Sequence, residues 1–239
     1  MIENPDRTNV LLAAARNNAA WCDAVCRAHG LPTHLGEELW TSAGRTPPFY
    51  PDAVTLDEAV SAPVLLAGID TESPGCSVKD SFAGLDLAGD GFEVLFDAQW
   101  IHRPAGAAAA DHGSRLEWSA VTAPEELEAW EAARDGGESG GVFRPALLTG
   151  RIAFLAGRAG GRIVAGAVAN ADAGVVGLSN VFAHDDADTD AAWAGALAAI
   201  AVRWPDLDVV GYESGADVDT ALRHGFTAIG PLRIWLHTA

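Results

Sequence analysis

GVVGLSNVFAHDDADTDAAWAGALAAIAVRWPDLDVVGYESGADVDTALRHGF, residues 174–226, is the stretch around which the chain is organised. Residues 175–183 have the β-branched and apolar character of a strand. After a polar loop, residues 189–203 place apolar side chains three and four positions apart, as one face of a helix requires. A second apolar run, residues 207–212, predicts a covered strand, and Gly225 closes a short helix after it. The stretch therefore predicts a strand-helix-strand unit.

In the order of these elements, residues 116–236 resemble the GNAT acyltransferases. That family has a core of a strand, a pyrophosphate-binding loop, a helix, a second strand and a short helix ending in Gly-Phe, here Gly225-Phe226. The resemblance implies an α/β (α+β) fold with a mixed, mostly antiparallel sheet flanked by helices. It also implies an N-acyltransferase that uses acetyl-CoA or another acyl-CoA to acylate the amine of a small molecule.

The loop before the long helix departs from the family pattern, which is roughly Arg/Gln-x-x-Gly-x-Gly/Ala. Small residues there let phosphates touch the backbone N–H groups at the start of the helix. This chain instead has HDDADTD at residues 184–190, with four aspartates and neither glycine nor arginine. Aspartates cap a helix well, but one close like-charge pair costs about 1 kcal/mol in water and up to about 4 kcal/mol near a protein surface. Unless these side chains point outward, the loop disfavours a pyrophosphate.

Two further family positions are changed. Ala221 stands where the short helix of the family usually carries a tyrosine, taken to protonate the leaving thiolate, and Ser214 stands where an asparagine is found. A general acid for the thiolate is therefore not visible. The alternative to an enzyme is a non-catalytic or repurposed module of the same fold, which binds a small ligand or a protein partner without acyl-CoA.

Other positions still indicate a site. The resemblance implies that the strand before the loop offers its backbone to the cofactor, and the predicted cofactor-binding residues are Asn180, Val181, Phe182, Ala183 and Ser214. Tyr212 and Glu213 end the next strand, at the mouth of an open sheet where ligands bind, so either is a candidate catalytic acid or base. The alternatives are a packed tyrosine and a surface glutamate. Candidate substrate contacts are Trp40, Tyr50 and Ser179, although aromatic side chains commonly belong to a core.

The rest of the chain shows further periodic segments. Residues 9–29 predict a helix with a buried stripe, and its polar residues Asn17, Asn18 and Asp23 lie off that stripe, where we expect solvent. Residues 78–87 read as a short helix or an irregular segment. Helix is also predicted over residues 123–133, and strands are predicted over residues 39–42, 49–56, 64–69, 92–102, 116–121, 152–156 and 162–170.

Residues 104–114 are rich in small residues and lack periodicity, which is typical of a linker. They divide the chain into a truncated GNAT-like or accessory α/β domain, residues 1–103, and a GNAT-like domain, residues 115–239, which we expect to share one sheet. Gly91-Phe92 precedes Trp100 much as Gly225-Phe226 precedes Trp235, and LWTS at residues 39–42 is similar to LEWS at residues 116–119. These echoes favour an old duplication, with chance as the alternative.

Composition limits the function. The 239 residues carry a formal net charge of −18, and only one of the 15 basic residues is a lysine, Lys79. Nucleic acids are bound through a basic face, so this class of partner is disfavoured, whereas a cationic substrate suits an acidic protein. No apolar run reaches the roughly 20 residues of a membrane span. The oligomeric state stays open.

The three cysteines, with no leader sequence apparent, favour a reducing cytoplasm. Cys22 and Cys26 are followed by His29 and His34, so a metal site that recruits a distant fourth ligand is one interpretation. The other, which we prefer, is that the two cysteines are small buried groups on the predicted helix. No metal is therefore expected.

Overall fold

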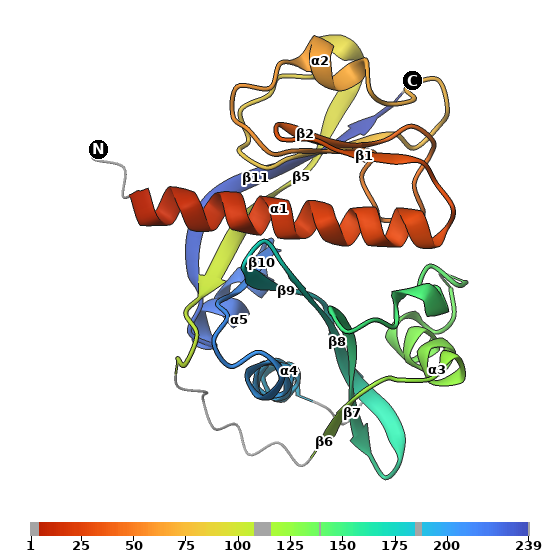
Figure 1. The fold of residues 1–239 in the computed structure, drawn as a ribbon, viewed down its shortest axis with the longest axis vertical. Helices are drawn as coiled ribbons and strands as arrows, with labels where there is room; N and C mark the ends of the chain where they lie inside the picture. Colours follow the sequence, from red (N-terminus) through yellow and green to blue (C-terminus); the bar gives the residue numbers. More distant parts are fainter. Residues whose placement is uncertain (1–4, 108–115, 139, 185–187, 239) are drawn as a thin grey trace.

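The computed structural model describes residues 5–107, 116–138, 140–184 and 188–238. Within these residues, eleven strands form one continuous sheet with the order β1-β2-β3-β4-β11-β5-β10-β9-β8-β7-β6. All neighbouring strands are antiparallel except two pairs, β3 with β4 and β9 with β10. The mixed, mostly antiparallel sheet flanked by helices is confirmed, and so is the expectation that both parts of the chain share it (Figure 1).

The first part of the chain begins with a long helix and then builds one end of the sheet. Its elements are α1 (Pro5–Ala28), β1 (Thr33–Leu35), β2 (Leu39–Ser42), β3 (Ala53–Thr55), α2 (Ala62–Leu66), β4 (Ser77–Asp80) and β5 (Phe92–Arg103). The second part contributes β6 (Glu117–Ala120), α3 (Pro124–Asp135), β7 (Ile152–Ala159), β8 (Arg162–Asp172), β9 (Val175–Ala183), α4 (Thr189–Arg203), β10 (Val209–Glu213), α5 (Ala216–Arg223) and β11 (Thr227–His237).

The two parts exchange strands at the centre of the sheet. β5, from the first part, lies between β10 and β11, and β11, from the second part, lies between β5 and β4. On each side of this central pair stands a parallel pair joined by a helix: β3, α2 and β4 on one side, and β9, α4 and β10 on the other. The repeated Gly-Phe pairs lie at the start of β5 and β11, the two exchanged strands. The similar segments LWTS and LEWS lie in β2 and β6, which do not occupy equivalent positions in the sheet. The duplication itself stays a prediction.

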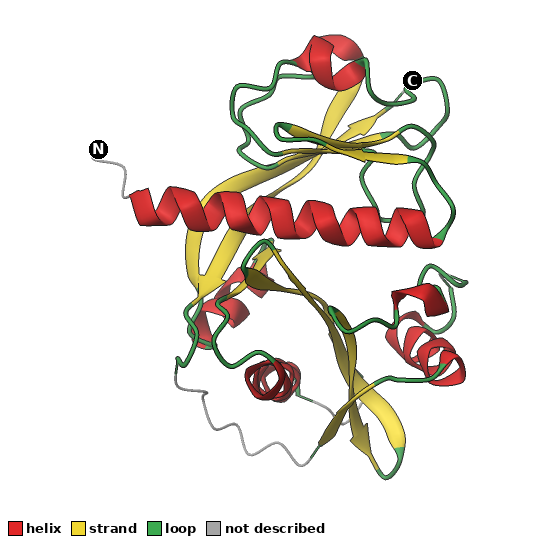
Figure 2. Ribbon diagram, viewed as in Figure 1, coloured by secondary structure: helices red, strands yellow, loops and turns green. Residues whose placement is uncertain are grey.

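Helices cover both faces of the sheet (Figure 2). Phe154 and Val168 point to the face covered by α1 and α3, where Trp21 and Trp130 fill the core. Leu155 and other alternate residues point to the opposite face, which α4 covers. α1 also packs on β1, β2 and β11 as well as on β8 and β9, so it contacts strands from both parts of the chain.

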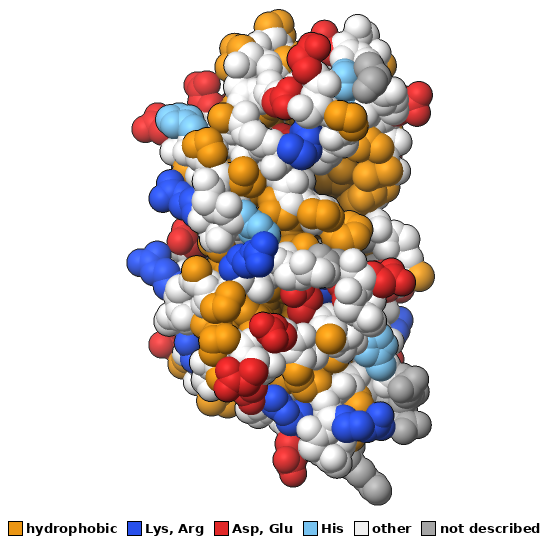
Figure 3. All heavy atoms as spheres, turned by 90° about the vertical axis from the view of Figure 1, so that its right-hand side faces the viewer, with side chains coloured by type: hydrophobic (Ala, Val, Ile, Leu, Met, Phe, Trp, Pro, Cys, Tyr) orange, Lys and Arg blue, Asp and Glu red, His pale blue; other side chains and the backbone are white. Residues whose placement is uncertain are grey.

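The surface mixes charge with apolar area. Figure 3 shows acidic, basic and hydrophobic side chains interspersed on one face, with a hollow lined by hydrophobic side chains in its upper half. None of the described helices is both long enough and apolar enough to cross a membrane.

Three sequence predictions in the first part are wrong. Residues 64–69 do not form a buried strand: α2 occupies the first half of this stretch, Pro63 fits its first turn, and Val64 is 57% exposed. The prediction for residues 78–87 is wrong for residues 78–80, which belong to β4 and pair with β3 and β11, whereas residues 81–87 are irregular as one of the two alternatives held. Distant strand partners of this kind leave no local signal. Of residues 49–56, only β3 is a strand. The remaining predicted helices and strands are confirmed, with ends shifted by a few residues.

Asn17 is also placed differently from its prediction, because its side chain is buried, with 1% exposure, rather than solvated. Its amide nitrogen donates to the carbonyl oxygens of Asn170, Asp172 and Val175 at 3.0, 3.1 and 3.3 Å. In return, Nδ2 of Asn170 donates to Oδ1 of Asn17 at 2.9 Å. The amide sits over Gly177, where any side chain would collide with it. This network fixes α1 to β8 and β9.

Replacing Asn17 with alanine should therefore destabilise the protein. The change leaves buried carbonyls without donors, which costs about 1 to 3 kcal/mol for each unsatisfied group. We expect urea denaturation to show a loss of about 2 kcal/mol in the free energy of unfolding. Arg16→Ala, at the neighbouring exposed position, is the control and should change stability by less than about 0.5 kcal/mol. Equal stabilities of the two variants would contradict the assigned role.

Candidate functional site

The opening of the site lies where β9 and β10 separate. Their parallel pairing is limited to Val209 with Val176 and Val210 with Gly177. β9 nevertheless continues alongside β8 as far as Ala183. Beyond Gly177, the edge of β9 that faces β10 is therefore left without a neighbouring strand. We refer to this separation of β9 from β10 as the splay.

A bulge in β9 lies inside this splay. Gly166 pairs with Phe182 and Val168 pairs with Ser179, so two residues of β9, Asn180 and Val181, oppose a single residue of β8. Asn180 has a φ of 51°, in the left-handed region, which asparagine tolerates better than most residues. Bulges of this kind re-aim side chains and are frequent beside functional sites.

The bulge also decides which backbone groups face the splay. The N–H of His184 donates to the carbonyl of Val164 on β8 at 2.8 Å. Because hydrogen-bonding direction alternates along an antiparallel strand, the N–H and C=O of Ala183 point to the opposite edge, where β10 has diverged. An extended ligand could pair with this edge as an additional strand does.

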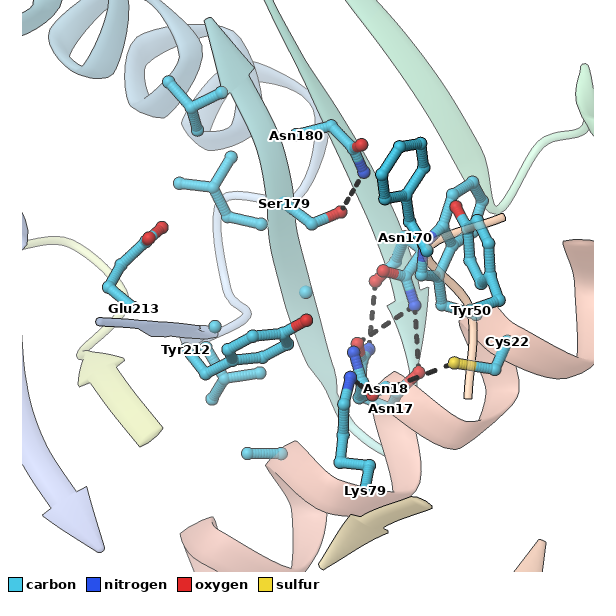
Figure 4. Close-up of a pocket in the computed structure, with 18 of the residues that line it drawn as sticks. Asn17, Asn18, Cys22, Tyr50, Lys79, Asn170, Ser179, Asn180, Tyr212 and Glu213 are labelled. Carbon is cyan, nitrogen blue, oxygen red and sulfur yellow. Dashed lines mark hydrogen bonds between the residues drawn. The ribbon is translucent and has the colours of Figure 1, made fainter. Parts of the chain in front are cut away.

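A cavity of about 330 Å³ lies beneath the splay and is bordered by α1, β4, β9 and β10 (Figure 4). The structure brings together six of the predicted site residues as lining of this cavity: Tyr50, Ser179, Asn180, Val181, Tyr212 and Glu213. Phe182, Ala183 and Ser214 are not among the described residues that line it. The Phe182 ring instead packs edge-on against Trp130, with ring centroids 5.2 Å apart.

Trp40 is the one candidate substrate contact that does not line the cavity. Its side chain is fully buried in the core between α1 and β3, and its indole Nε1 donates to Oδ1 of Asp23 at 3.1 Å. The prediction that Trp40 lines a pocket with Tyr50 is therefore wrong. The bulk of an indole ring favoured the core, and a carboxylate on α1 satisfies its polar edge.

Glu213 has an environment suited to acid-base chemistry. Burial, and to a lesser degree the nearby charge of Asp217, raise the pKa of the Glu213 carboxyl to about 7. A carboxyl with such a pKa is partly ionised at neutral pH and can take up or release a proton there. Figure 4 shows its side chain directed away from Asn17, Asn18 and Asn170, on the far side of Tyr212.

Tyr212 forms the wall between Glu213 and the first part of the chain. Its ring packs edge-on against Trp100, with centroids 5.6 Å apart, and the Lys79 ammonium lies 4.2 Å from the ring centroid. Tyr212 is thus packed, as the alternative interpretation held, and it also lines the cavity.

Sequence reasoning missed several residues that line this cavity. Lys79 is 3% exposed and donates from Nζ to Oδ1 of Asn18 at 2.7 Å. Arg134, on α3, donates to Oδ1 of Asn180 at 2.8 Å and forms an ion pair with Asp135. Asn18, predicted to face solvent, instead lines the cavity. The one available signal was that Lys79 is the only lysine of the chain.

A second cavity of about 550 Å³ adjoins the first and belongs mostly to the first part of the chain. Phe49, Tyr50, Pro51, Lys79 and Tyr212 line both cavities. The remaining lining of the second cavity is largely apolar, from Pro47, Pro48, Leu95, Phe96, Ile234 and Leu236.

The start of α4 is capped by its own acidic residues. Asp188 is the N-cap, and its carboxylate accepts from the N–H of Asp190 at 3.1 Å. Asp190 turns toward α5, where Arg223 and His224 lie 3.1 and 3.0 Å away. Burial alone would raise the pKa of Asp190, but hydrogen bonds from His224 and Arg223 outweigh it and lower the pKa. The predictions for Asp185, Asp186 and Ala187 lie outside the described residues.

Among the described residues, no group of three or more histidine, cysteine, aspartate and glutamate side chains could hold an ion. Cys22 and Cys26 lie on α1 and are buried in the core, which agrees with the preferred interpretation. Burial, followed by the charge of Cys22, raises the pKa of the Cys26 thiol to about 12.

Comparisons with solved structures agree with this geometry. A GCN5-related N-acetyltransferase from Kribbella flavida has a TM-score of 0.66 and 15% sequence identity, over 95% of this chain and 96% of its own. A protein from Novosphingobium aromaticivorans described within the GNAT family has a TM-score of 0.56 and 13% identity, over 91% of this chain and 97% of its own. A GCN5-related N-acetyltransferase-like protein from Streptococcus suis has a TM-score of 0.52 and 11% identity, over 87% and 83%.

The chain therefore has the GNAT fold, and the likeness extends over both parts of the chain. No family model and no curated protein matches the sequence. At these identities the likeness establishes architecture, while the reaction has to be argued from the site itself.

Proposed function

We propose that the protein is an N-acyltransferase that moves an acyl group, acetyl in the simplest case, from acyl-CoA to the amine of a small molecule. The observation that carries the proposal is the cavity under the splay of β9 and β10, with a partly buried carboxyl of raised pKa, Glu213, in its wall. The open edge at Ala183 provides backbone groups for the amide-containing arm of the cosubstrate. The residues present thus fit that part of acyl-CoA.

In this proposal Glu213 is the base. When bound, acyl-CoA supplies an activated acyl group as a thioester. The Glu213 carboxylate takes a proton from the ammonium of the acceptor, and the freed amine then attacks the acyl carbon. The bond from carbon to sulfur breaks as the Tyr212 hydroxyl gives a proton to the departing sulfur. The attacking nitrogen loses its second proton as the amide forms, and this proton restores the Tyr212 hydroxyl. Ala221 is fully buried and offers no acid.

The first test is calorimetric titration of acetyl-CoA and of free CoA into the protein at low and moderate salt. Micromolar binding, followed by release of free thiol when amines are added, would support the proposal. The alternative function is a repurposed GNAT-like module that binds a small ligand or a protein partner. The acidic start of α4 and the alanine at position 221 favour it. No heat at high CoA concentration would exclude the enzyme and leave this alternative.

The acidic start of α4 makes a prediction of its own. Asp188→Asn keeps a good N-cap but removes a negative charge from the place where a pyrophosphate would bind. A like charge nearby costs about 1 kcal/mol, so we expect CoA to bind roughly five-fold more tightly to this variant at low salt, and less so at high salt. Calorimetry measures the change.

The matched control is Asp206→Asn, which removes the same charge beyond the opposite end of α4. This variant should bind CoA as the unmodified protein does. An equal gain in both variants would mean that only the overall charge matters, and no gain in Asp188→Asn would place the pyrophosphate elsewhere.

A further inference from the structure

Lys79 is a buried cation that lacks a buried anion. It stands on β4, and its ammonium contacts Oδ1 of Asn18 at 2.7 Å and the face of the Tyr212 ring at 4.2 Å. No carboxylate of the described residues forms an ion pair with it. Every other basic residue of the chain is an arginine, so this lysine does not belong to a general set of solubilising surface lysines.

The energetics of such a group favour an anionic ligand. Taking an ammonium out of water costs several kcal/mol unless an opposite charge and further hydrogen bonds compensate. One amide oxygen and one aromatic face provide part of this compensation. An ammonium has three donors, and Asn18 engages one of them. A ligand carboxylate at this position would supply the missing negative charge in a site that is already shielded from water.

The position of Lys79 defines what the rest of that ligand must look like. Its side chain lines both cavities: the polar one that contains Glu213, and the apolar one lined by Leu95, Phe96 and Ile234. A molecule with its carboxylate at Lys79 can therefore send an amine into the first cavity and an apolar group into the second. The first part of the chain would thus select the acceptor molecule, while the second part would supply the acid-base residues that act on its amine.

We propose that the acceptor is an amino acid-like molecule, an amine that also carries a carboxylate and an apolar side chain, and that Lys79 binds the carboxylate. This rests on the proposed acyltransferase function and names its substrate class. The overall charge is compatible with it: a net charge of −18 repels anions at long range, but an amine with one carboxylate is a zwitterion without net charge. A dicarboxylate would be repelled.

The test compares phenylalanine with phenylalaninamide, which has the same amine and side chain but no carboxylate. Both are titrated calorimetrically into the protein without acyl-CoA, and both are assayed as acceptors with acetyl-CoA. We expect the unmodified protein to prefer phenylalanine at least ten-fold, in Kd and in KM. Lys79→Met, which keeps the length of the side chain, should raise both constants for phenylalanine about 100-fold and change those for the amide less than three-fold.

Three results would overturn the proposal. The unmodified protein could bind phenylalaninamide as tightly as phenylalanine. This comparison requires no variant. Lys79→Met could weaken both ligands equally, which would make Lys79 a structural residue. Lys79→Arg could fail to retain the preference for the acid while its thermal unfolding is unchanged. If phenylalanine binds and the preference follows Lys79 but no acetyl transfer occurs, the carboxylate site stands and the acyltransferase function fails.

Discussion

Glu213→Gln is expected to lower the rate of acyl transfer by a factor of about 10² to 10⁴, the range that positioned general bases contribute. Glutamine has the same size as glutamate and can occupy the same place in the wall of the cavity, but it cannot accept a proton from the acceptor ammonium. The change should act on kcat/KM, while calorimetry should show that CoA binds as before. An active Glu213→Gln variant would remove the residue from the mechanism.

The pH dependence of kcat/KM tests the role of Glu213 more specifically. The base works only when ionised, and burial together with Asp217 raises the pKa of Glu213 to about 7. In the unmodified protein, kcat/KM should therefore fall tenfold per pH unit below about pH 7, and this limb should vanish in Glu213→Gln. Asp217→Asn is the matched control. It removes the smaller of the two causes, so the limb should move to lower pH without loss of the maximal rate.

Stability should change in the opposite direction to activity. A carboxyl with a folded-state pKa above its ordinary value of 4.5 contributes stability fully at low pH, and this contribution is lost as the pH rises toward 7. By pH 8 the folded protein holds a charge that the unfolded chain keeps in water. Glu213→Gln removes that cost, so its free energy of unfolding should exceed that of the unmodified protein at pH 8, and the difference should shrink toward pH 4. Urea denaturation at both pH values measures this.

The second large effect concerns the division of the chain. Residues 115–239 expressed alone should fail to fold, although the resemblance covers them almost completely. The reason is β5, which lies between β10 and β11 and belongs to the first part of the chain. Without it, both strands lose a neighbour along their length, and cores under α1 such as that around Trp21 are opened. We expect no cooperative urea transition, and light scattering should detect aggregation through the exposed strand edges.

The control keeps every strand and breaks only the connection. Residues 1–107 and residues 116–239, expressed together as two chains, contain both β5 and β11 and should assemble into a complex that unfolds cooperatively. If residues 115–239 alone unfold cooperatively, the predicted boundary marks a true domain and the exchange of strands is not essential. If the two chains together remain unfolded, the connection itself is needed for folding.

Local patterns in the sequence determined much of the second part of the chain. The helix predicted over residues 189–203 is α4, and the hairpin of β7 and β8 lies where alternation placed it. Tyr212 and Glu213 were found because a strand's end can be read from the run of apolar residues before it. The echo of Gly-Phe before β5 and β11 was also visible, since short matches survive in the primary sequence.

The tertiary structure alone decided the partners of these elements. β4 is a strand because it pairs with β11, more than 150 residues away, and Lys79 is a buried cation because α1 and β10 close over that strand. The sequence by itself determined the fold class and two residues of the candidate chemistry, because periodicity and chain order are local properties. Burial, the pKa of Glu213 and the junction of the two cavities depend on contacts between distant segments, which only the folded chain brings together.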